Sequence, residues 1–206
     1  EIFNFNPELI LDYANISHIQ PDAFKNCRNR RIRSLRIPID GLKEYDGDYI
    51  VFSRKHLSLF EPLKEHLEEL DLACDFKCHF NFLWHLKKLK TLRLGRSVFK
   101  NGGKPVFKCV NDNQLTHLDL NLDQLELSDK TMFSDLKCLT HLELSFAELD
   151  RNVLPDLFKE LKRLETLKLK RKTVRLCQIA DDAFIYLENL KELHFVFIDI
   201  PKECIL

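Results

Sequence analysis

The chain has 206 residues, of which 45% are hydrophobic and 31% are charged, and its 32 Lys and Arg residues balance its 32 Asp and Glu residues. This much apolar material excludes a disordered chain, and a formal net charge of zero argues against nucleic acid as the partner. No apolar run is long enough to span a membrane, so we expect membrane attachment only through regions absent from this chain. Without a linker or charge block, we expect one domain over residues 1–206, as a fragment of a longer protein.

A hexapeptide with apolar residues at its first, fourth and sixth positions recurs from the N-terminus onward. A degraded copy contains Leu9 and Leu11. Clear copies follow, starting at Ile32, Leu67, Leu89, Leu115, Leu139, Leu164 and Leu190. In each copy the fourth and sixth residues alternate as in a strand that buries one face. The chain therefore contains about eight repeats, each with one short predicted strand.

A second apolar pattern, with a spacing of three residues, precedes four of the predicted strands. Its members are Leu83, Leu86 and Leu89; Phe133, Leu136 and Leu139; Phe158, Leu161 and Leu164; and Phe184, Leu187 and Leu190. A spacing of three places side chains on one face of a 3-10 turn. We expect each repeat to combine a strand, a loop and a helical turn, and neighbouring repeats to stack their apolar residues into one continuous core.

These residues and their spacing resemble the leucine-rich repeat family over about Leu9 to Phe195. The segments ISHIQPDAFKNC, from Ile16, and IADDAFIYLENLKELHF, from Ile179, are similar to repeats of extracellular Toll-like, chaoptin-like and Slit-like ectodomains. The resemblance implies an α/β repeat fold, a leucine-rich repeat solenoid curved like a horseshoe. A parallel β-sheet would line its concave face, with loops and 3-10 or short helical turns on its convex face.

The chain departs from the family pattern in several places. The family's asparagine, three residues after the last strand anchor, is replaced by Asp40, Asp75, Ser97, Asp123, Ala147, Lys172 and Ile198. The interval between Ile37 and Leu67 is longer than the others, so we expect residues 40–52 to bulge out as a loop. The cysteine-rich caps of such ectodomains are not recognisable at either end. Exposed terminal repeats would be a liability, which favours a larger parent protein.

The outward-facing strand residues form the predicted binding surface, on the concave face. They mix acidic, basic and imidazole side chains, and the position after the strand adds an apolar rim at Leu122, Phe146 and Phe197. Apolar anchors beside charged residues are common at protein interfaces. The alternative is that these are ordinary solvated strand residues. The candidate ligand-binding residues are Arg93, His117, Asp119, Leu122, His141, Glu143, Phe146, Lys168 and His194.

The sequence offers little support for chemistry other than binding. His117, Asp119, His141 and Glu143 fall on adjacent predicted strands, which leaves zinc as an alternative, but these residues are also ordinary variants of the repeat. We expect no metal and no cofactor. The sequence has no glycine-rich phosphate loop and no nucleophile elbow, so we also expect no enzymatic activity.

The cysteines and one glycosylation sequon point to different compartments. The seven cysteines are irregularly spaced, and Cys27 and Cys138, beside the Phe-x-x-Leu turns, are expected to be buried free thiols, which oxidising compartments disfavour. Asn15, in the sequence Asn15-Ile16-Ser17, is the candidate glycosylation site of a secreted protein.

Two functional hypotheses follow from the resemblance. The leading one is a receptor-type ectodomain, extracellular or at the cell surface, that recognises a protein ligand or co-receptor through its concave face. The alternative is a cytoplasmic leucine-rich repeat adaptor, such as the substrate-recognition subunit of a ubiquitin ligase. The acidic centre at Asp119 and Glu143 favours a partner with matching basic groups, and not nucleic acid.

Overall fold

The computed structural model describes most of the predicted strands and the turns that precede them. The described residues are 8–10, 22–27, 31–37, 57–72, 83, 85–96, 107, 114–122, 130–146, 154–171 and 182–197. The expected bulge at residues 40–52, the seven positions that replace the family's asparagine, and Asn15 all lie outside the described residues. The extent of the domain, and the longer parent protein, stay predictions.

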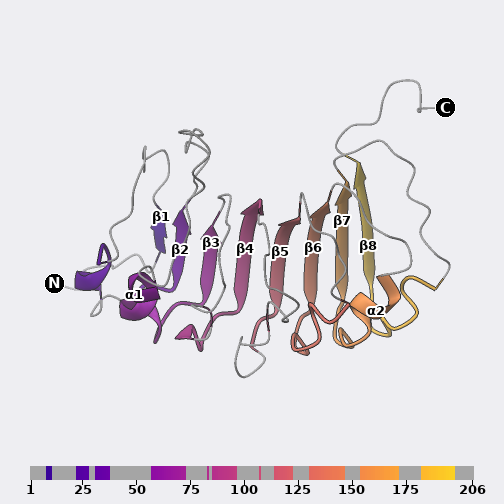
Figure 1. Ribbon diagram of the computed structural model, residues 1–206, viewed down its shortest axis with the longest axis horizontal. Coiled ribbons are helices and arrows are strands. Elements are labelled where there is room, and N and C mark those ends of the chain that lie inside the picture. Colours follow the sequence, from indigo (N-terminus) through magenta and orange to yellow (C-terminus); the bar gives the residue numbers. More distant parts are fainter. Residues whose placement is uncertain are drawn as a thin grey trace.

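Eight strands form one parallel sheet in which every strand pairs with its neighbours in the chain (Figure 1). They are β1 (Glu8–Ile10), β2 (Ser34–Ile37), β3 (Glu69–Leu72), β4 (Thr91–Arg96), β5 (His117–Leu122), β6 (His141–Phe146), β7 (Thr166–Arg171) and β8 (Glu192–Phe197). Each return path therefore advances the chain by one strand, which makes the molecule a solenoid. The predicted fold class, a leucine-rich repeat solenoid with a parallel sheet, is confirmed.

The register of the sheet aligns equivalent residues of successive repeats. Leu92 of β4 pairs with Leu70 of β3 and with Leu118 of β5, and all three side chains are buried. Because side chains alternate across a strand, the two leucines of each repeat point to the same face. One stripe of leucine therefore runs across the sheet and forms its side of the core.

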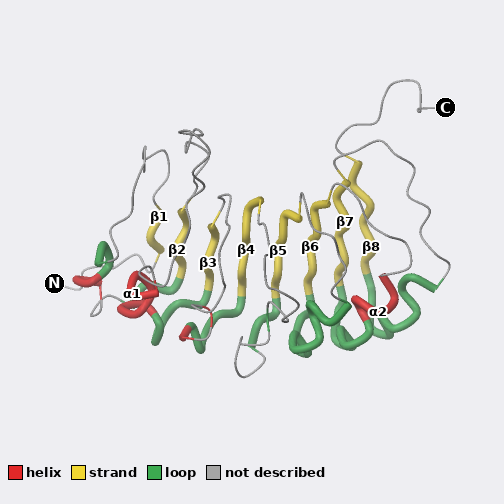
Figure 2. The backbone as a smooth tube through the Cα atoms, viewed as in Figure 1, coloured by secondary structure: helices red, strands yellow, loops and turns green. Residues whose placement is uncertain are grey.

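Short helical segments and turns gather at the end of the sheet where the strands begin (Figure 2). The helical segments are η1 (Lys25–Cys27), α1 (Leu57–Phe60), η3 (Glu61–Leu63) and α2 (Leu154–Phe158). In the turn before β6, the amide of Leu136 donates to the carbonyl of Phe133 at 3.0 Å, and that of Leu139 to Leu136 at 3.1 Å. Bonds to the third residue back are those of a 3-10 turn, and the same pair recurs before β4, β7 and β8, so the predicted turns are confirmed.

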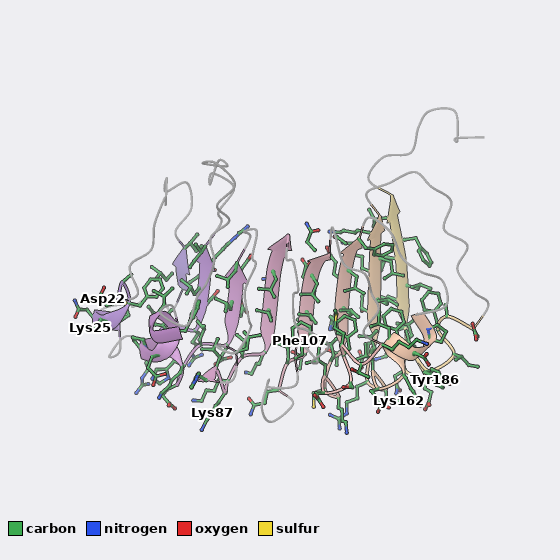
Figure 3. All side chains as sticks on the ribbon, viewed as in Figure 1. Asp22, Lys25, Lys87, Phe107, Lys162 and Tyr186 are labelled. Carbon is green, nitrogen blue, oxygen red and sulfur yellow. The ribbon has the colours of Figure 1, made fainter. Side chains whose placement is uncertain are left out.

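Phenylalanine rings at these turns stack from one repeat to the next. The centroids of Phe158 and Phe184 are 6.3 Å apart, and those of Phe107 and Phe133 are 6.1 Å apart. Phe107 is fully buried and lies near the base of β5 (Figure 3). It was not predicted, because it precedes Leu115 by eight residues and therefore breaks the spacing of three.

Neighbouring repeats also share a ladder of forked backbone hydrogen bonds at the strand entrance. The carbonyl of Glu68 accepts from the amides of Lys90 and Thr91, at 2.7 and 3.0 Å. Carbonyls at the same position of five other repeats, on Arg33, Lys90, Thr116, Thr140 and Glu165, each accept two amides from the following repeat. Each carbonyl accepts hydrogen bonds from two consecutive amides, so a shift of one strand by one residue would break two bonds at once. These bonds therefore fix the register at the point where each strand begins.

The outer turns of the last two described repeats are joined by polar contacts. The ammonium of Lys162 lies 2.9 Å from the carboxylate of Glu188 and 5.2 Å from the centre of the Tyr186 ring (Figure 3). The side-chain amide of Asn189 donates to the carbonyl of Lys162 at 2.7 Å. These exposed contacts orient the turns but contribute little free energy compared with the leucine core.

The apolar strand residues of the core are buried from β2 to β7 and partly exposed at β8. Leu193 and Phe195 occupy the positions of the buried Leu167 and Leu169 one repeat earlier, yet they are 38% and 42% exposed. No described residue stacks on the far side of β8, so among the described residues these side chains are covered from one side.

The helices among the described residues are all too short to span a membrane.

This difference in covering predicts unequal costs for the same truncation at equivalent positions. Leu167→Ala removes a fully buried side chain and should lower the free energy of unfolding by about 3 kcal/mol. Leu193→Ala, one repeat later, should lower it by only about 1 kcal/mol, because less apolar surface is lost from the core. Urea denaturation followed by circular dichroism measures both, and equal losses would contradict the one-sided covering of β8.

Candidate binding site

The face of the sheet opposite the core carries two polar rows, which we call the first row and the central row. Strand pairing places the members of each row side by side. The first row is Ser34, Glu69, Thr91, His117, His141, Thr166 and Glu192, and the central row is Arg36, Asp71, Arg93, Asp119, Glu143, Lys168 and His194. The sheet thus turns a sequence repeat into two continuous lines of side chains.

A hollow of about 330 Å³ lies over the middle of both rows, between β4 and β8. Seven of the nine predicted ligand-binding residues line it: Arg93, His117, Asp119, His141, Glu143, Lys168 and His194. Thr91 and Thr166 of the first row and the leucines 92, 118 and 142 complete its lining. The predicted surface is therefore one contiguous site in space, and its role in binding stays a prediction.

The predicted apolar rim is wrong for Phe146. The side chain of Phe146 is only 5% exposed and belongs to the core. Because β6 continues two residues beyond the hexapeptide, alternation puts Phe146 on the same side as Leu142 and Leu144. The backbone of Leu122 pairs with that of Phe146, whereas the side chains of Leu122 and Phe197 lie outside what the structure describes.

Two histidines stack against each other at the centre of the hollow. The rings of His117 and His141 are 4.1 Å apart between centroids and inclined by only 10°. The hydroxyls of Thr116 and Thr140, which precede them, lie 2.9 Å from the respective Nδ1 atoms. The same hydroxyls donate to the carbonyls of Lys90 and Thr116, at 3.2 and 3.1 Å.

These contacts favour one position for the ring proton. Each threonine has one hydroxyl proton, and it is used on a backbone carbonyl, so its oxygen is left to accept from an Nδ1–H group. In that arrangement the uncharged imidazole rings of His117 and His141 carry the proton on Nδ1 and a lone pair on Nε2. Burial lowers the pKa of His117 below its usual value of 6.5, with further lowering from His141 and Arg93, which favours this neutral form.

Most carboxylates of the central row have a cation beside them. Asp71 lies 3.4 Å from the guanidinium of Arg36. Glu143 forms ion pairs with Lys168, at 3.3 Å, and with Lys170. Burial alone would raise the pKa of Glu143, but these two ammonium groups outweigh it and hold the pKa below its usual value.

Asp119 is the exception in this row. It is half-buried, and within the described residues no hydrogen bond or ion pair involves its carboxylate. Burial raises the pKa of Asp119 from 3.8 to about 6, with Glu143 and Asp71 adding to the rise and Lys170 and Arg93 opposing it. The carboxylate at the floor of the hollow is thus less well compensated than its neighbours.

Replacing Asp119 by the neutral, isosteric asparagine should stabilise the protein at neutral pH. A raised pKa means that ionisation of Asp119 costs folding free energy, a cost present above about pH 6 and absent below about pH 4, where both folded and unfolded chains are protonated. After allowance for solvent screening, Asp119→Asn should raise the free energy of unfolding near pH 7.5 by about 1 kcal/mol. Urea denaturation near pH 7.5 and below about pH 4 measures the difference in the free energy of unfolding between the variant and the wild type. A variant less stable than the wild type near pH 7.5 would contradict it.

The remaining predicted sites have mixed outcomes. Among the described residues, no group of three or more His, Cys, Asp or Glu side chains is arranged to hold a metal ion, and the His–Asp–His–Glu set does not form one. Cys27 and Cys138 are free thiols. Both thiols are half-buried and not fully buried as predicted. Cys27 packs against the core three residues after Phe24, in place of a leucine, whereas Cys138 precedes the core residue Leu139 and lies 3.7 Å from the guanidinium of Arg163.

Comparison with known proteins gives structural neighbours but no matching sequence. No protein-family model and no curated protein sequence matches the chain. Among solved structures, an internalin C2 from Listeria monocytogenes is similar, with 22% sequence identity and a TM-score of 0.44. The match covers 71% of this chain and 61% of that one, so the chain spans less than two thirds of the internalin's length. The fold assignment rests on strand order and register and not on this similarity.

Proposed function

We propose that this protein is a non-enzymatic protein-binding module that recognises its partner through the two polar rows. The observation that carries this proposal is the in-register alignment of seven predicted residues around one hollow. A paired parallel sheet holds these side chains in place before the partner arrives, so little conformational entropy is lost on binding. This preorganisation supports a binding role for the surface.

The dimensions of the site favour a macromolecule over a small molecule. Strands lie about 4.8 Å apart, so the five strands β4 to β8 span roughly 19 Å. An α-helix with its side chains is about 10–12 Å wide and would rest on this surface with room on both sides. Exposed ion pairs of the central row, such as that between Arg36 and Asp71, contribute about 1 kcal/mol or less and are easily exchanged for contacts with a partner.

The short contacts between threonine and histidine do not form a catalytic pair. A hydroxyl nucleophile would have to donate its proton to the imidazole. Here the hydroxyls of Thr116 and Thr140 also lie 3.2 and 3.1 Å from backbone carbonyls, and donation to these carbonyls leaves no hydroxyl proton for the imidazole. This arrangement supports a binding role over an enzymatic one.

Charge reversal in the hollow should abolish partner binding. Asp119→Lys/Glu143→Lys places two ammonium groups where acceptors now stand and should reduce recovery of partners in a quantitative pull-down by about tenfold or more. The control is Glu160→Lys/Asp182→Lys, which makes the same change in net charge at two exposed turn residues outside the hollow. Circular dichroism checks that both variants fold. Equal recovery of every partner by all three proteins would refute the proposal.

Within this binding role, we propose a receptor-type ectodomain, extracellular or at the cell surface, that engages a protein ligand or co-receptor. The sequon at Asn15 supports this location. The free thiols of Cys27 and Cys138 favour the second candidate, a cytoplasmic adaptor such as the substrate-recognition subunit of a ubiquitin ligase, because unpaired thiols suit a reducing compartment.

Mass spectrometry of the protein isolated from its native source separates these two candidates. A glycan on Asn15 is expected for the ectodomain, and a bare Asn15 with seven free thiols is expected for the adaptor. Recombinant protein made without a secretory pathway serves as the unglycosylated reference. The second result would overturn the extracellular assignment and leave the binding role intact.

A further inference from the structure

The floor of the hollow presents hydrogen-bond acceptors that no described residue uses. Asp119 offers a carboxylate without a hydrogen bond or ion pair among the described residues, and the same holds for the Nε2 atoms of His117 and His141. Both rings place Nδ1 against their own threonine, so the two Nε2 atoms lie on the opposite edges of the stacked rings. All three groups line the same hollow.

From this set of acceptors we infer that the hollow binds the ammonium group of one lysine side chain from the partner, with Asp119 as its counter-ion and His117 and His141 as neutral acceptors. This inference rests on the proposed function and names the chemistry at its centre. An ammonium carries three N–H donors and no acceptor, and the floor offers a carboxylate and two lone-pair nitrogens. Donors and acceptors therefore match in number and in kind.

The stacking geometry favours a compact cation over a planar one. Nearly parallel rings with centroids 4.1 Å apart present their Nε2 edges side by side, so one compact ammonium lying beside the pair can donate to both. A guanidinium instead presents a flat fork of donors that suits the two oxygens of one carboxylate. The paired imidazole edges therefore select lysine over arginine.

The surrounding charges leave Asp119 available to a new cation. Arg93 on β4 approaches from one side without coming within ion-pair distance among the described contacts, and Lys168 and Lys170 on β7 are held by Glu143. Asp71 on β3 is paired with Arg36. Despite Arg93 and Lys170, the pKa of Asp119 stays near 6, so its negative charge is incompletely compensated. An ammonium group from the partner would neutralise the remaining negative charge of Asp119.

The direct test is NMR titration of the whole chain with Nα-acetyl-lysine methylamide. We expect saturable shifts of the His117 and His141 ring protons, with a Kd in the millimolar range, and a fall of about one unit or more in the pKa of Asp119, because a bound opposite charge stabilises its ionised form. The affinity should fall about tenfold from pH 7.5 to pH 5, as the carboxylate of Asp119 becomes protonated. The probe itself stays charged over this range.

Matched probes and variants make the result decisive. The Nε-acetylated probe, which is neutral, should cause no saturable shift, and Nα-acetyl-arginine methylamide should bind more weakly than the lysine probe. Asp119→Asn should weaken binding of the lysine probe at least tenfold, whereas Glu165→Gln, which makes the same charge change at a strand entrance outside the hollow, should leave it unchanged. Equal binding of the neutral or the arginine probe, or no effect of Asp119→Asn, would overturn the inference.

Ring tautomers give an independent readout. Nitrogen-15 shifts at neutral pH should show His117 and His141 protonated on Nδ1, and Thr116→Val should move His117 toward the Nε2–H form and weaken binding of the lysine probe severalfold. Finding Nε2–H rings in the wild type would overturn the acceptor arrangement. If Asp119→Lys/Glu143→Lys loses the protein partner but Asp119→Asn keeps it with unchanged affinity, the lysine site is wrong and the binding role still stands.

Discussion

Stacking of each repeat on its neighbours is the interaction on which the rest of this structure depends. A single repeat has a few leucines on a short strand and one aromatic turn, and it has no second layer of its own to cover them. Leu92, for example, is fully buried between the equivalent leucines of the strands on either side. Covering is lost where the stack thins, as at Leu193 and Phe195 on β8. Stability in this fold is therefore shared between neighbours and differs along the solenoid.

The same stacking determines the geometry of the proposed binding surface. Because forked hydrogen bonds hold the register at every strand entrance, residues 24 or 25 positions apart in the chain become direct neighbours, as His117 is of His141 and Glu143 of Lys168. This register alone aligns the side chains of the first row and of the central row. The threonine before each histidine contributes to both the strand register and the proposed site. Its hydroxyl contacts a carbonyl of the hydrogen-bond ladder and also the imidazole that follows.

Asp119 illustrates how the proposed binding surface carries a cost in the free energy of folding. Its carboxylate stands next to Glu143, the one step of the central row where two like charges are adjacent, and the nearby lysines engage Glu143. An uncompensated, half-buried charge is unfavourable for folding, and a ligand of opposite charge relieves it. Local destabilisation of this kind is expected where a protein is arranged for a partner and not for its own stability.

The sequence alone was sufficient for the fold, the strand positions and both polar rows, because the hexapeptide repeats with a clear period and alternation assigns each residue to one face. It also placed the 3-10 turns, from the spacing of three between Phe133, Leu136 and Leu139. Phe107 was missed because it precedes Leu115 by eight residues and not by six, and Phe146 was misplaced because only the structure shows that β6 continues beyond the motif. Only the tertiary structure decided which charges of the central row are compensated and that the two histidine rings stack beside the hydroxyls of Thr116 and Thr140. Both depend on distances of a few ångströms between neighbouring repeats, which no spacing along the chain records.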